Sequence, residues 1–222
     1  MKIILFGASG MVGQGVLREC ILDPGVESVL VIGRRKLGTL PAKVREILRE
    51  DVGDLAPIAD ELRGYDGCCF CLGVSSAGMK EADYRRVTYD LTLKAARTLA
   101  EASPNLIFIY VSGAGTDSTE HGRSMWARVK GETENVLLSL PFKAAYMLRP
   151  GLIQPRHGIK SKTPIYRVIY ILGSPLIALL KVMTPGLVTT TDRVGRAMIK
   201  LIAGSSAERV LENKEINRLA IS

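Results

Sequence analysis

Three glycines near the start of the chain have the spacing of a loop that binds phosphate groups. Gly7, Gly10 and Gly13 follow an apolar segment at residues 2–6 and lead into a segment with helical periodicity. The first glycine permits a tight turn, the second lets backbone N–H groups approach a pyrophosphate, and the third lets the helix pack closely on the strand. We therefore expect a dinucleotide to bind here, with its pyrophosphate on the consecutive residues Gly7, Ala8, Ser9, Gly10, Met11, Val12 and Gly13.

Two adjacent arginines, Arg34 and Arg35, lie at the tip of the expected second strand. Proteins of this type that use NAD carry Asp or Glu about 20 residues past the glycine loop, where the carboxylate binds the adenosine ribose. The segment here has no carboxylate, and a guanidinium fork suits a 2′-phosphate. The pair predicts NADP as the cofactor rather than NAD; the alternative is that both side chains belong to a solvated turn.

Two segments after the expected fifth strand resemble the active-site motifs of the short-chain dehydrogenases/reductases (SDRs). They read Tyr110-Val-Ser112-Gly-Ala-Gly115 and Ser124-Met-Trp126-Ala-Arg-Val-Lys130-Gly-Glu132. In that superfamily a serine polarises the substrate carbonyl, and a YxxxK motif supplies a tyrosine that transfers a proton. The lysine of that motif binds the nicotinamide ribose and lowers the tyrosine pKa. The resemblance, which covers nearly the whole chain, therefore implies catalytic positions at Ser112, Trp126 and Lys130.

The tyrosine of that motif is replaced here by Trp126. Hydride transfer to a carbonyl leaves an oxyanion, which needs a proton from a group within hydrogen-bond reach. An indole N–H donates a hydrogen bond but has no proton to transfer. Either another group supplies the proton, with His121, Tyr84 and Tyr89 as candidates, or the protein binds NADP(H) without efficient turnover.

Four further segments resemble the Tat-interacting-protein oxidoreductases, atypical SDRs that bind NADPH and are related to NmrA-like regulators. They are the opening through Leu37, the run Arg86-Val-Thr-Tyr-Asp-Leu-Thr-Leu-Lys-Ala-Ala, the run Val129-Lys130-Gly-Glu-Thr-Glu, and the tail Val210-Leu-Glu-Asn-Lys-Glu-Ile. This resemblance implies further cofactor contacts. They are Asp51 and Val52 at the adenine, Leu72, Gly73 and Val74 along the cofactor, Lys130 at the ribose, and Pro150, Gly151, Leu152 and Ile153 at the nicotinamide.

Apolar strand patterns alternate with helical patterns through the first two thirds of the chain. Strands are expected at residues 2–6, 28–32, 44–48, 67–72, 106–111 and 143–148, and helices at 11–22, 58–62, 80–102 and 122–140. This alternation is typical of a parallel, doubly wound sheet with right-handed crossovers. The sequence therefore predicts an α/β fold of the Rossmann type, in which strand ends face the ligand crevice.

The alternation stops after Gly151, although 222 residues suit a single domain. We expect one NAD(P)-binding domain over residues 1–222, with residues 155–205 forming a small helical cap or interface region before a final short strand. An apolar stretch at residues 165–183 is interrupted by Arg167, Gly173, Pro175 and Lys181. A membrane-spanning helix needs about 20 mostly uninterrupted apolar residues, so one or two helices that cover the substrate cleft or an oligomer interface are the better interpretation.

The net charge of +8 is concentrated in one region, since residues 142–200 hold ten Lys or Arg residues and the single acid Asp192. Such a region suits an anionic small-molecule substrate, the cofactor phosphates or an acidic surface, and a solvated basic face is the plain alternative. Peripheral contact with a membrane also stays open. We expect no nucleic-acid partner, because no aromatic-interleaved basic stripe accompanies the charge.

The four cysteines have no disulfide spacing, and Cys68, Cys69 and Cys71 share one apolar strand. With two histidines in the chain, we expect buried thiols and no metal site. The first strand begins at residue 2 and leaves no room for a signal peptide, which predicts a cytoplasmic protein.

Two functions fit these observations, and the oligomeric state stays open. One is an NADP-dependent oxidoreductase acting on a small carbonyl compound in a cleft covered by the C-terminal region. The other is a non-catalytic NADP(H)-binding sensor or regulator that acts through a protein partner, which the tryptophan at position 126 would favour.

Overall fold

The computed structural model describes residues 1–159, 186–204 and 206–221, and its centre is a parallel sheet with strand order β3-β2-β1-β4-β5-β6-β9. A separate parallel pair joins β7 to β8. The strands are β1 (Lys2–Phe6), β2 (Ser28–Gly33), β3 (Val44–Leu48), β4 (Gly67–Phe70), β5 (Ile107–Val111), β6 (Ala144–Arg149), β7 (Leu152–Gln154), β8 (Val188–Thr190) and β9 (Val210–Glu212).

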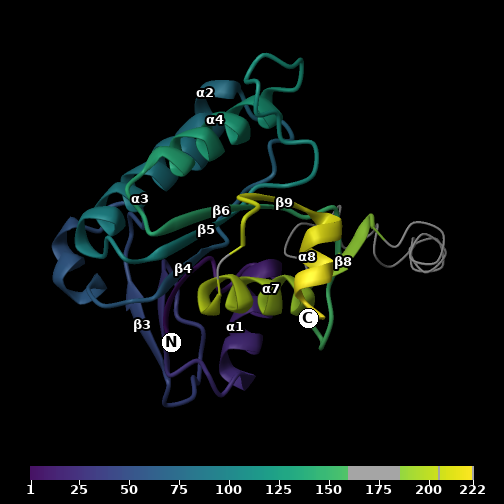
Figure 1. The fold of residues 1–222 in the computed structure, drawn as a ribbon. Coiled ribbons are helices and arrows are strands. Elements are labelled where there is room, and N and C mark those ends of the chain that lie inside the picture. The colour runs from purple at the N-terminus through teal and green to yellow at the C-terminus, as the bar shows by residue number, and fades with distance from the viewer. Residues whose placement is uncertain (160–185, 205, 222) are drawn as a thin grey trace.

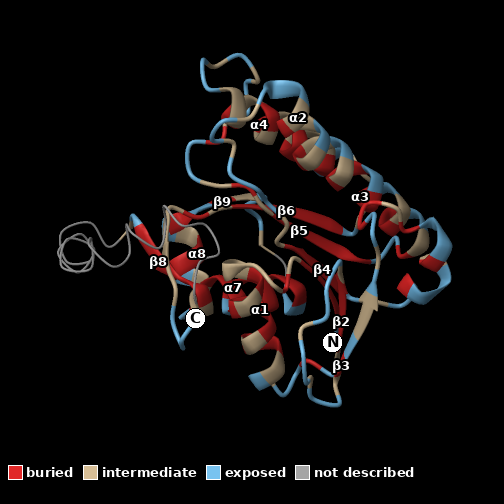
Figure 2. Ribbon diagram, turned by 180° about the vertical axis from the view of Figure 1, so that it is seen from behind, coloured by how far each residue is buried: buried red, intermediate tan, exposed pale blue. Residues whose placement is uncertain are grey.

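Helices cover both faces of this sheet (Figure 1). They are α1 (Met11–Leu22), the 3₁₀ helix η1 (Ala56–Leu62), α2 (Glu81–Arg85), the π-helix η2 (Arg86–Asp90), α3 (Leu91–Ala102), α4 (Met125–Ser139), α7 (Thr191–Ala203) and α8 (Asn213–Leu219). Helices α1 and α7 lie on one face, and α3 and α4 lie on the other. The faces that the helices turn to the sheet are buried, and their outer faces are exposed (Figure 2).

The two sheet faces bury alternate residues of each strand. In β1, Ile3 and Leu5 belong to the core cluster under α1 and α7, whereas Ile4 and Phe6 belong to the cluster under α3 and α4. A strand covered on both sides must be apolar throughout. This is why the short apolar runs of the sequence, which lack a polar alternation, form the centre of the sheet.

The expected Rossmann-type α/β fold is confirmed. Residues 2–6 and 44–48 form strands and residues 11–22 form a helix, all at the predicted bounds. The other expected strands and helices are present with ends that differ by one to three residues, with one exception. The helix expected over residues 80–102 is three consecutive segments, α2, η2 and α3, with the π-helical turn in the middle.

Most of the cap expected at residues 155–205 lies outside the described residues. Its described C-terminal part includes α7, which packs beside α1 on the sheet. Val194, Ala197 and Met198 of α7 share one buried cluster with Val16 and Cys20 of α1. Among the described residues, no helix is long and apolar enough to cross a membrane.

A buried ion pair fixes α4 to the end of β6. Arg149, at the end of β6, has its Nε 3.1 Å from both carboxylate oxygens of Glu134 on α4. The Glu134 side chain has no exposed surface and that of Arg149 is 11% exposed. The same guanidinium also donates to Ser118 and to Glu212 of β9. One side chain thus joins α4, β6, β9 and the loop before α4.

We predict that Arg149→Met lowers the free energy of unfolding by about 3–5 kcal/mol, because it leaves the Glu134 carboxylate buried without its partner. The matched control is Arg218→Met, whose exposed pair with Glu208 contributes less than about 1 kcal/mol. Urea unfolding followed by circular dichroism measures both. Equal losses in the two variants would contradict a structural role for the buried pair.

Candidate functional site

The loop between β1 and α1 is compressed against its neighbours at two glycines. Gly7 has a φ of 76°, and a Cβ there would lie 2.6 Å from the carbonyl oxygen of Cys71. A Cβ on Gly13 would lie 2.1 Å from the carbonyl oxygen of Gly7. The N–H of Gly10 donates to the same carbonyl at 2.8 Å and closes the turn. Any side chain at Gly7 or Gly13 would therefore separate β1 from β4 or from α1.

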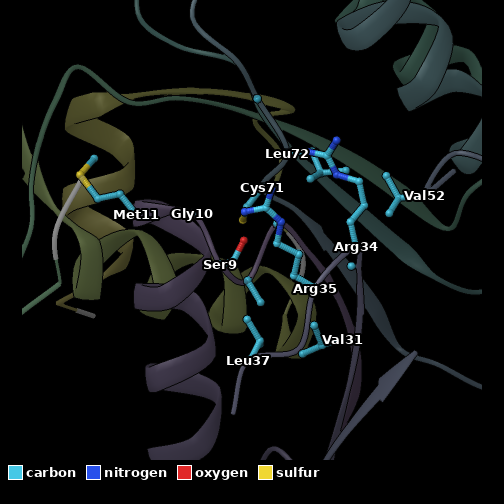
Figure 3. Close-up of a pocket in the computed structure, with 14 residues that line it drawn as sticks. Ser9, Gly10, Met11, Val31, Arg34, Arg35, Leu37, Val52, Cys71 and Leu72 are labelled. Atoms are coloured by element: carbon cyan, nitrogen blue, oxygen red, sulfur yellow. The ribbon is translucent and has the colours of Figure 1, made fainter. Parts of the chain in front are cut away.

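A cavity of about 360 Å³ opens over this loop. It lies at the carboxyl ends of β1, β2 and β4, where a doubly wound sheet binds its ligands. Figure 3 shows the side chains of Arg34 and Arg35 extending from the turn after β2 toward it. The lining residues are Gly7, Ala8, Ser9, Gly10, Met11, Val31, Gly33, Arg34, Arg35, Leu37, Val52, Cys71, Leu72 and Gly73.

The charge of this first cavity is entirely positive. Arg34 and Arg35 are exposed, and no Asp or Glu is among the lining residues. Within the part of the chain that the structure describes, neither guanidinium has an ion-pair partner. Two unpaired cations beside a glycine loop form a site for an anion that carries more than one charge.

Asp51, expected beside the adenine, is not among the residues that line the cavity. Its carboxylate accepts a hydrogen bond from Lys94 at 3.0 Å and one from the Gly53 N–H at 2.9 Å. The bond from Lys94, followed by that from Gly53, lowers the pKa of Asp51. Val52, the other residue expected there, is buried and lines the cavity. The structure therefore gives Asp51 a role in holding the loop after β3 to α3.

A second cavity of about 620 Å³ continues from the first. The two share Gly10, Met11, Cys71, Leu72 and Gly73, so they form one extended crevice. The other residues lining the second cavity are Val12, Val74, Ser75, Ser76, Tyr84, Val111, Ser112, Gly113, Ala114, Trp126, Lys130, Pro150, Gly151, Leu152 and Ile153. Of the site residues predicted from the sequence, only Gly13 and Asp51 line neither cavity.

Ser112, at the end of β5, offers the second cavity a hydrogen-bond acceptor. Its hydroxyl donates to the carbonyl oxygen of Leu148 on β6 at 3.0 Å, and its backbone N–H donates to the same oxygen at 2.9 Å. In this arrangement the hydroxyl hydrogen points at the sheet. Polarising a carbonyl, the role that the resemblance implies, requires that hydrogen to turn toward the cavity.

Lys130 of α4 reaches back to the end of β5. Its Nζ donates to the carbonyl oxygen of Ser112 at 2.6 Å and to that of Val111 at 3.4 Å, and it lies 5.5 Å from the ring centroid of Tyr110. Burial lowers the pKa of Lys130 to about 8, against a smaller opposing effect of Glu134. The carboxylate of Glu134 is bound to Arg149, and its effect on the pKa of Lys130 is smaller than that of burial.

Trp126 lies one helical turn before Lys130 and lines the same cavity. Its ring faces Gly115, since a Cβ built on that glycine would be 3.6 Å from the ring atom Cη2. The tryptophan thus occupies the wall of the crevice where the SDR tyrosine is expected. It brings an apolar surface and one N–H donor to that wall.

Comparisons with known proteins show which proteins this chain is similar to. No protein-family model matches the chain. The protein HTATIP2 of Rattus norvegicus is 30% identical to this chain over 155 residues. The match covers 68% of this chain and 62% of HTATIP2, so it spans less than two thirds of the length of HTATIP2. The mitochondrial protein FMP52-1 of Scheffersomyces stipitis is 23% identical over 182 residues, 79% of each chain.

Among solved structures, MoeE5 in complex with UDP-glucose and NAD superimposes with a TM-score of 0.66. The match covers 99% of this chain and 81% of that chain at 17% identity, and it shows the SDR fold. The chain is thus similar to the HTATIP2 and FMP52 proteins and shares the fold of SDR-family epimerases and dehydrogenases, which is consistent with an atypical short-chain dehydrogenase/reductase. The predicted resemblance is thereby confirmed for the superfamily and for the Tat-interacting proteins, whereas a relation to NmrA-like regulators stays a prediction.

The prediction that this protein is cytoplasmic is wrong on these comparisons. Its FMP52 relatives are named mitochondrial proteins. The prediction relied on the first strand beginning at residue 2, and the position of a strand does not report the compartment in which a folded domain acts.

Sequence reasoning missed some residues that line the crevice, Cys71 among them, and named Tyr84 only as a candidate proton source. Cys71 lies between the expected strand and the expected contacts at Leu72 to Val74, and it borders both cavities. Tyr84, buried on α2, lines the second cavity. Of the other residues weighed as proton sources, His121 and Tyr89 line neither cavity. The signal for Cys71 was its place at a strand end, whereas the orientation of Tyr84 depends on how α2 packs.

The C-terminal helix α8 holds the crevice segment that follows β6. The side-chain oxygen of Asn213 accepts the Gly151 N–H at 2.9 Å, and its side-chain N–H donates to the carbonyl of Gly186 at 2.7 Å. One turn later Asn217 donates to the carbonyl of Val188 at 2.9 Å. These amides attach the strand pair of β7 and β8 to the end of the chain, which gives the family-like tail a structural role.

We predict that Asn213→Ala lowers the free energy of unfolding by about 1–3 kcal/mol, because two backbone groups lose their partner. It should also change the emission of Trp126, the single tryptophan, since Gly151 and Trp126 line the same cavity. The control is Asn105→Ala, an exposed asparagine. A Trp126 emission that is the same in both variants would show that Asn213 does not position the crevice.

Proposed function

We propose that this protein binds NADP(H) in the crevice and uses it to interconvert a small carbonyl compound and its alcohol. The observation that carries the proposal is the charge of the first cavity, where Arg34 and Arg35 are present and no carboxylate is. A 2′-phosphate fits such a pair, whereas the ribose diol of NAD is usually held by an acid.

The residues present suit the parts of this cofactor. The compressed glycine loop and the start of α1 present backbone N–H groups to a pyrophosphate. Arg34 and Arg35 would hold the 2′-phosphate at one end of the crevice. The other end, with Lys130 and Leu152, has the volume for the nicotinamide ribose and a small substrate. When bound, the cofactor supplies or accepts the hydride.

The lining of the second cavity favours an uncharged, apolar carbonyl compound. Among the described residues that line it, Lys130 is the only charged one, and most of the others are apolar or glycine. Trp126 and Tyr84 offer aromatic surface to such a substrate. An anionic substrate, which the basic region of the sequence suggested, has no second cation in this described lining.

A non-catalytic NADP(H) sensor is the second candidate. This function is favoured by Trp126 at the tyrosine position. It is also favoured by the hydroxyl of Ser112, which donates its hydrogen bond to the carbonyl oxygen of Leu148. Both features weaken the usual carbonyl chemistry without affecting the glycine loop or the arginines. The cofactor proposal therefore holds for either candidate, and turnover separates them.

We expect NADPH to bind about 10- to 100-fold more tightly than NADH, since hydrogen bonds to a charged group contribute about 1.5–3 kcal/mol. Quenching of the Trp126 emission measures both dissociation constants. Replacing Arg34 and Arg35 together by alanine should remove the difference, whereas Arg63→Ala, at an exposed arginine outside both cavities, should keep it. Equal affinities in the wild-type protein would refute the role of the arginine pair.

We also expect Trp126→Tyr to raise the rate of NADPH-dependent reduction by about 10-fold or more, because a positioned general acid contributes about 10²–10⁴. The matched control is Trp126→Phe, which lacks the hydroxyl. Reduction of 4-nitrobenzaldehyde followed at 340 nm measures the rate, and NADPH emission checks cofactor binding. If both variants bind NADPH and neither turns over, the sensor function is favoured.

A further inference from the structure

The second cavity contains few groups able to give a proton. Among the described residues that line it, only Cys71, Tyr84 and Lys130 carry a titratable proton. Burial raises the pKa of the Cys71 thiol well above its usual value, which makes the thiol a poor acid. Tyr84 is almost completely buried on α2. Lys130 is the one cationic acid among the three.

We propose that Lys130 is the proton donor of the reduction, in place of the absent tyrosine. The inference rests on the proposed function, because it assigns an acid to the reaction that NADPH would drive. It also goes beyond the role that the family resemblance implies, in which the lysine binds ribose and a tyrosine transfers the proton. It applies to this chain because of the tryptophan at position 126.

The geometry places the ammonium at the reacting end of the crevice. Lys130 Nζ donates to the backbone oxygen of Ser112 at 2.6 Å, so it lies beside a residue that lines the second cavity. An ammonium has three N–H donors, and the carbonyls of Ser112 and Val111 take two of them. Among the described residues no third acceptor is bonded to Nζ, so one N–H is free for a substrate oxygen.

The surroundings of Lys130 leave its proton removable. On its own helix, Glu134 is bound by Arg149 of β6, and Glu132 is bound by Arg85 of α2. From β5 it faces the phenol of Tyr110, whose pKa burial raises far above neutrality. Without a free carboxylate partner among these described neighbours, burial disfavours the ammonium form and lowers the pKa of Lys130 to about 8.

The other groups around the cavity add no charge to Lys130 at neutral pH. Cys71 after β4 lines the same space as a neutral thiol, because burial raises its pKa, and Tyr84 of α2 lines it as well. The nearest carboxylates on α2, Glu81 and Asp83, pair with Arg128 and Arg86. No unpaired anion among these neighbours is therefore positioned to keep the proton on Lys130.

The reaction then balances in one step. The carbonyl carbon gains a hydride from NADPH, which is oxidised to NADP⁺, and the C=O π bond breaks. The carbonyl oxygen takes a proton from Nζ of Lys130, so the products are an alcohol and a neutral amine. The amine regains its proton from solvent. In the reverse direction the neutral amine accepts the proton of the alcohol.

The test is Lys130→Arg, which keeps the cation and its hydrogen bonds but cannot release a proton near neutral pH. NADPH binding should stay within about 10-fold of the wild-type protein. Reduction of 4-nitrobenzaldehyde should fall by about 100-fold or more, the contribution of general acid catalysis. Lys200→Arg, at an exposed lysine of α7, is the control, and Tyr84→Phe is the variant for the competing acid.

The pH profile adds a readout that a structural role would not change. Because the ammonium form is the acid, kcat/KM for reduction should be highest below pH 8 and fall about tenfold per unit above it, following the Lys130 pKa of about 8. Oxidation of 4-nitrobenzyl alcohol should rise over the same interval. Both breaks should be absent in Lys130→Arg and present in Lys200→Arg and Tyr84→Phe.

Rescue by small amines covers the case in which the arginine does not fit. In Lys130→Ala, added ethylammonium should restore part of the reduction rate, and amines of lower pKa should restore more. Full reductase activity in Lys130→Arg overturns the inference and leaves the proposed function standing. So does a loss of reductase activity in Tyr84→Phe that Lys130→Arg does not show. A wild-type protein that binds NADPH and reduces no carbonyl overturns both.

Discussion

The close contact of the backbone at Gly7 with its neighbours is the constraint on which the crevice depends. Its carbonyl oxygen accepts the Gly10 N–H and would lie 2.1 Å from a Cβ on Gly13. The backbone at Gly7 also meets that of Cys71 at the end of β4. Three elements, β1, α1 and β4, therefore converge at one turn without any side chain between them. Both cavities open from this turn, and both need it to be compact.

The two ends of the crevice are stabilised by different interactions. At the arginine end, backbone packing at the glycine loop positions the site, and the cations reach in from the turn after β2. At the other end, α4 is held by the buried pair of Arg149 and Glu134. The segment after β6 is held by Asn213 from the end of the chain.

The sequence predicted the features that local pattern determines. A strand buried on both faces, such as residues 2–6, shows as an apolar run, and the glycine spacing identifies the turn after it. What it did not predict depends on partners distant in the chain. Asp51 accepts a hydrogen bond from Lys94 of α3 and lines neither cavity. The π-helical turn was missed because hydrophobic periodicity cannot distinguish a π-helical turn from an α-helix. The hydroxyl of Thr92, in α3, donates to the carbonyl oxygen of Thr88 in this turn.

A tryptophan at position 126 changes the chemistry available to the lysine after it. Beside a tyrosine, an ammonium stays charged, because its charge lowers the tyrosine pKa and gains a phenolate partner. Beside an indole, the ammonium of Lys130 has only the carbonyls of Ser112 and Val111 for partners, and burial makes its charged form less stable. Carbonyl dipoles orient the ammonium but do not neutralise it. The lysine at this position thus activates the tyrosine as an acid where a tyrosine is present, and is itself the acid where position 126 is a tryptophan.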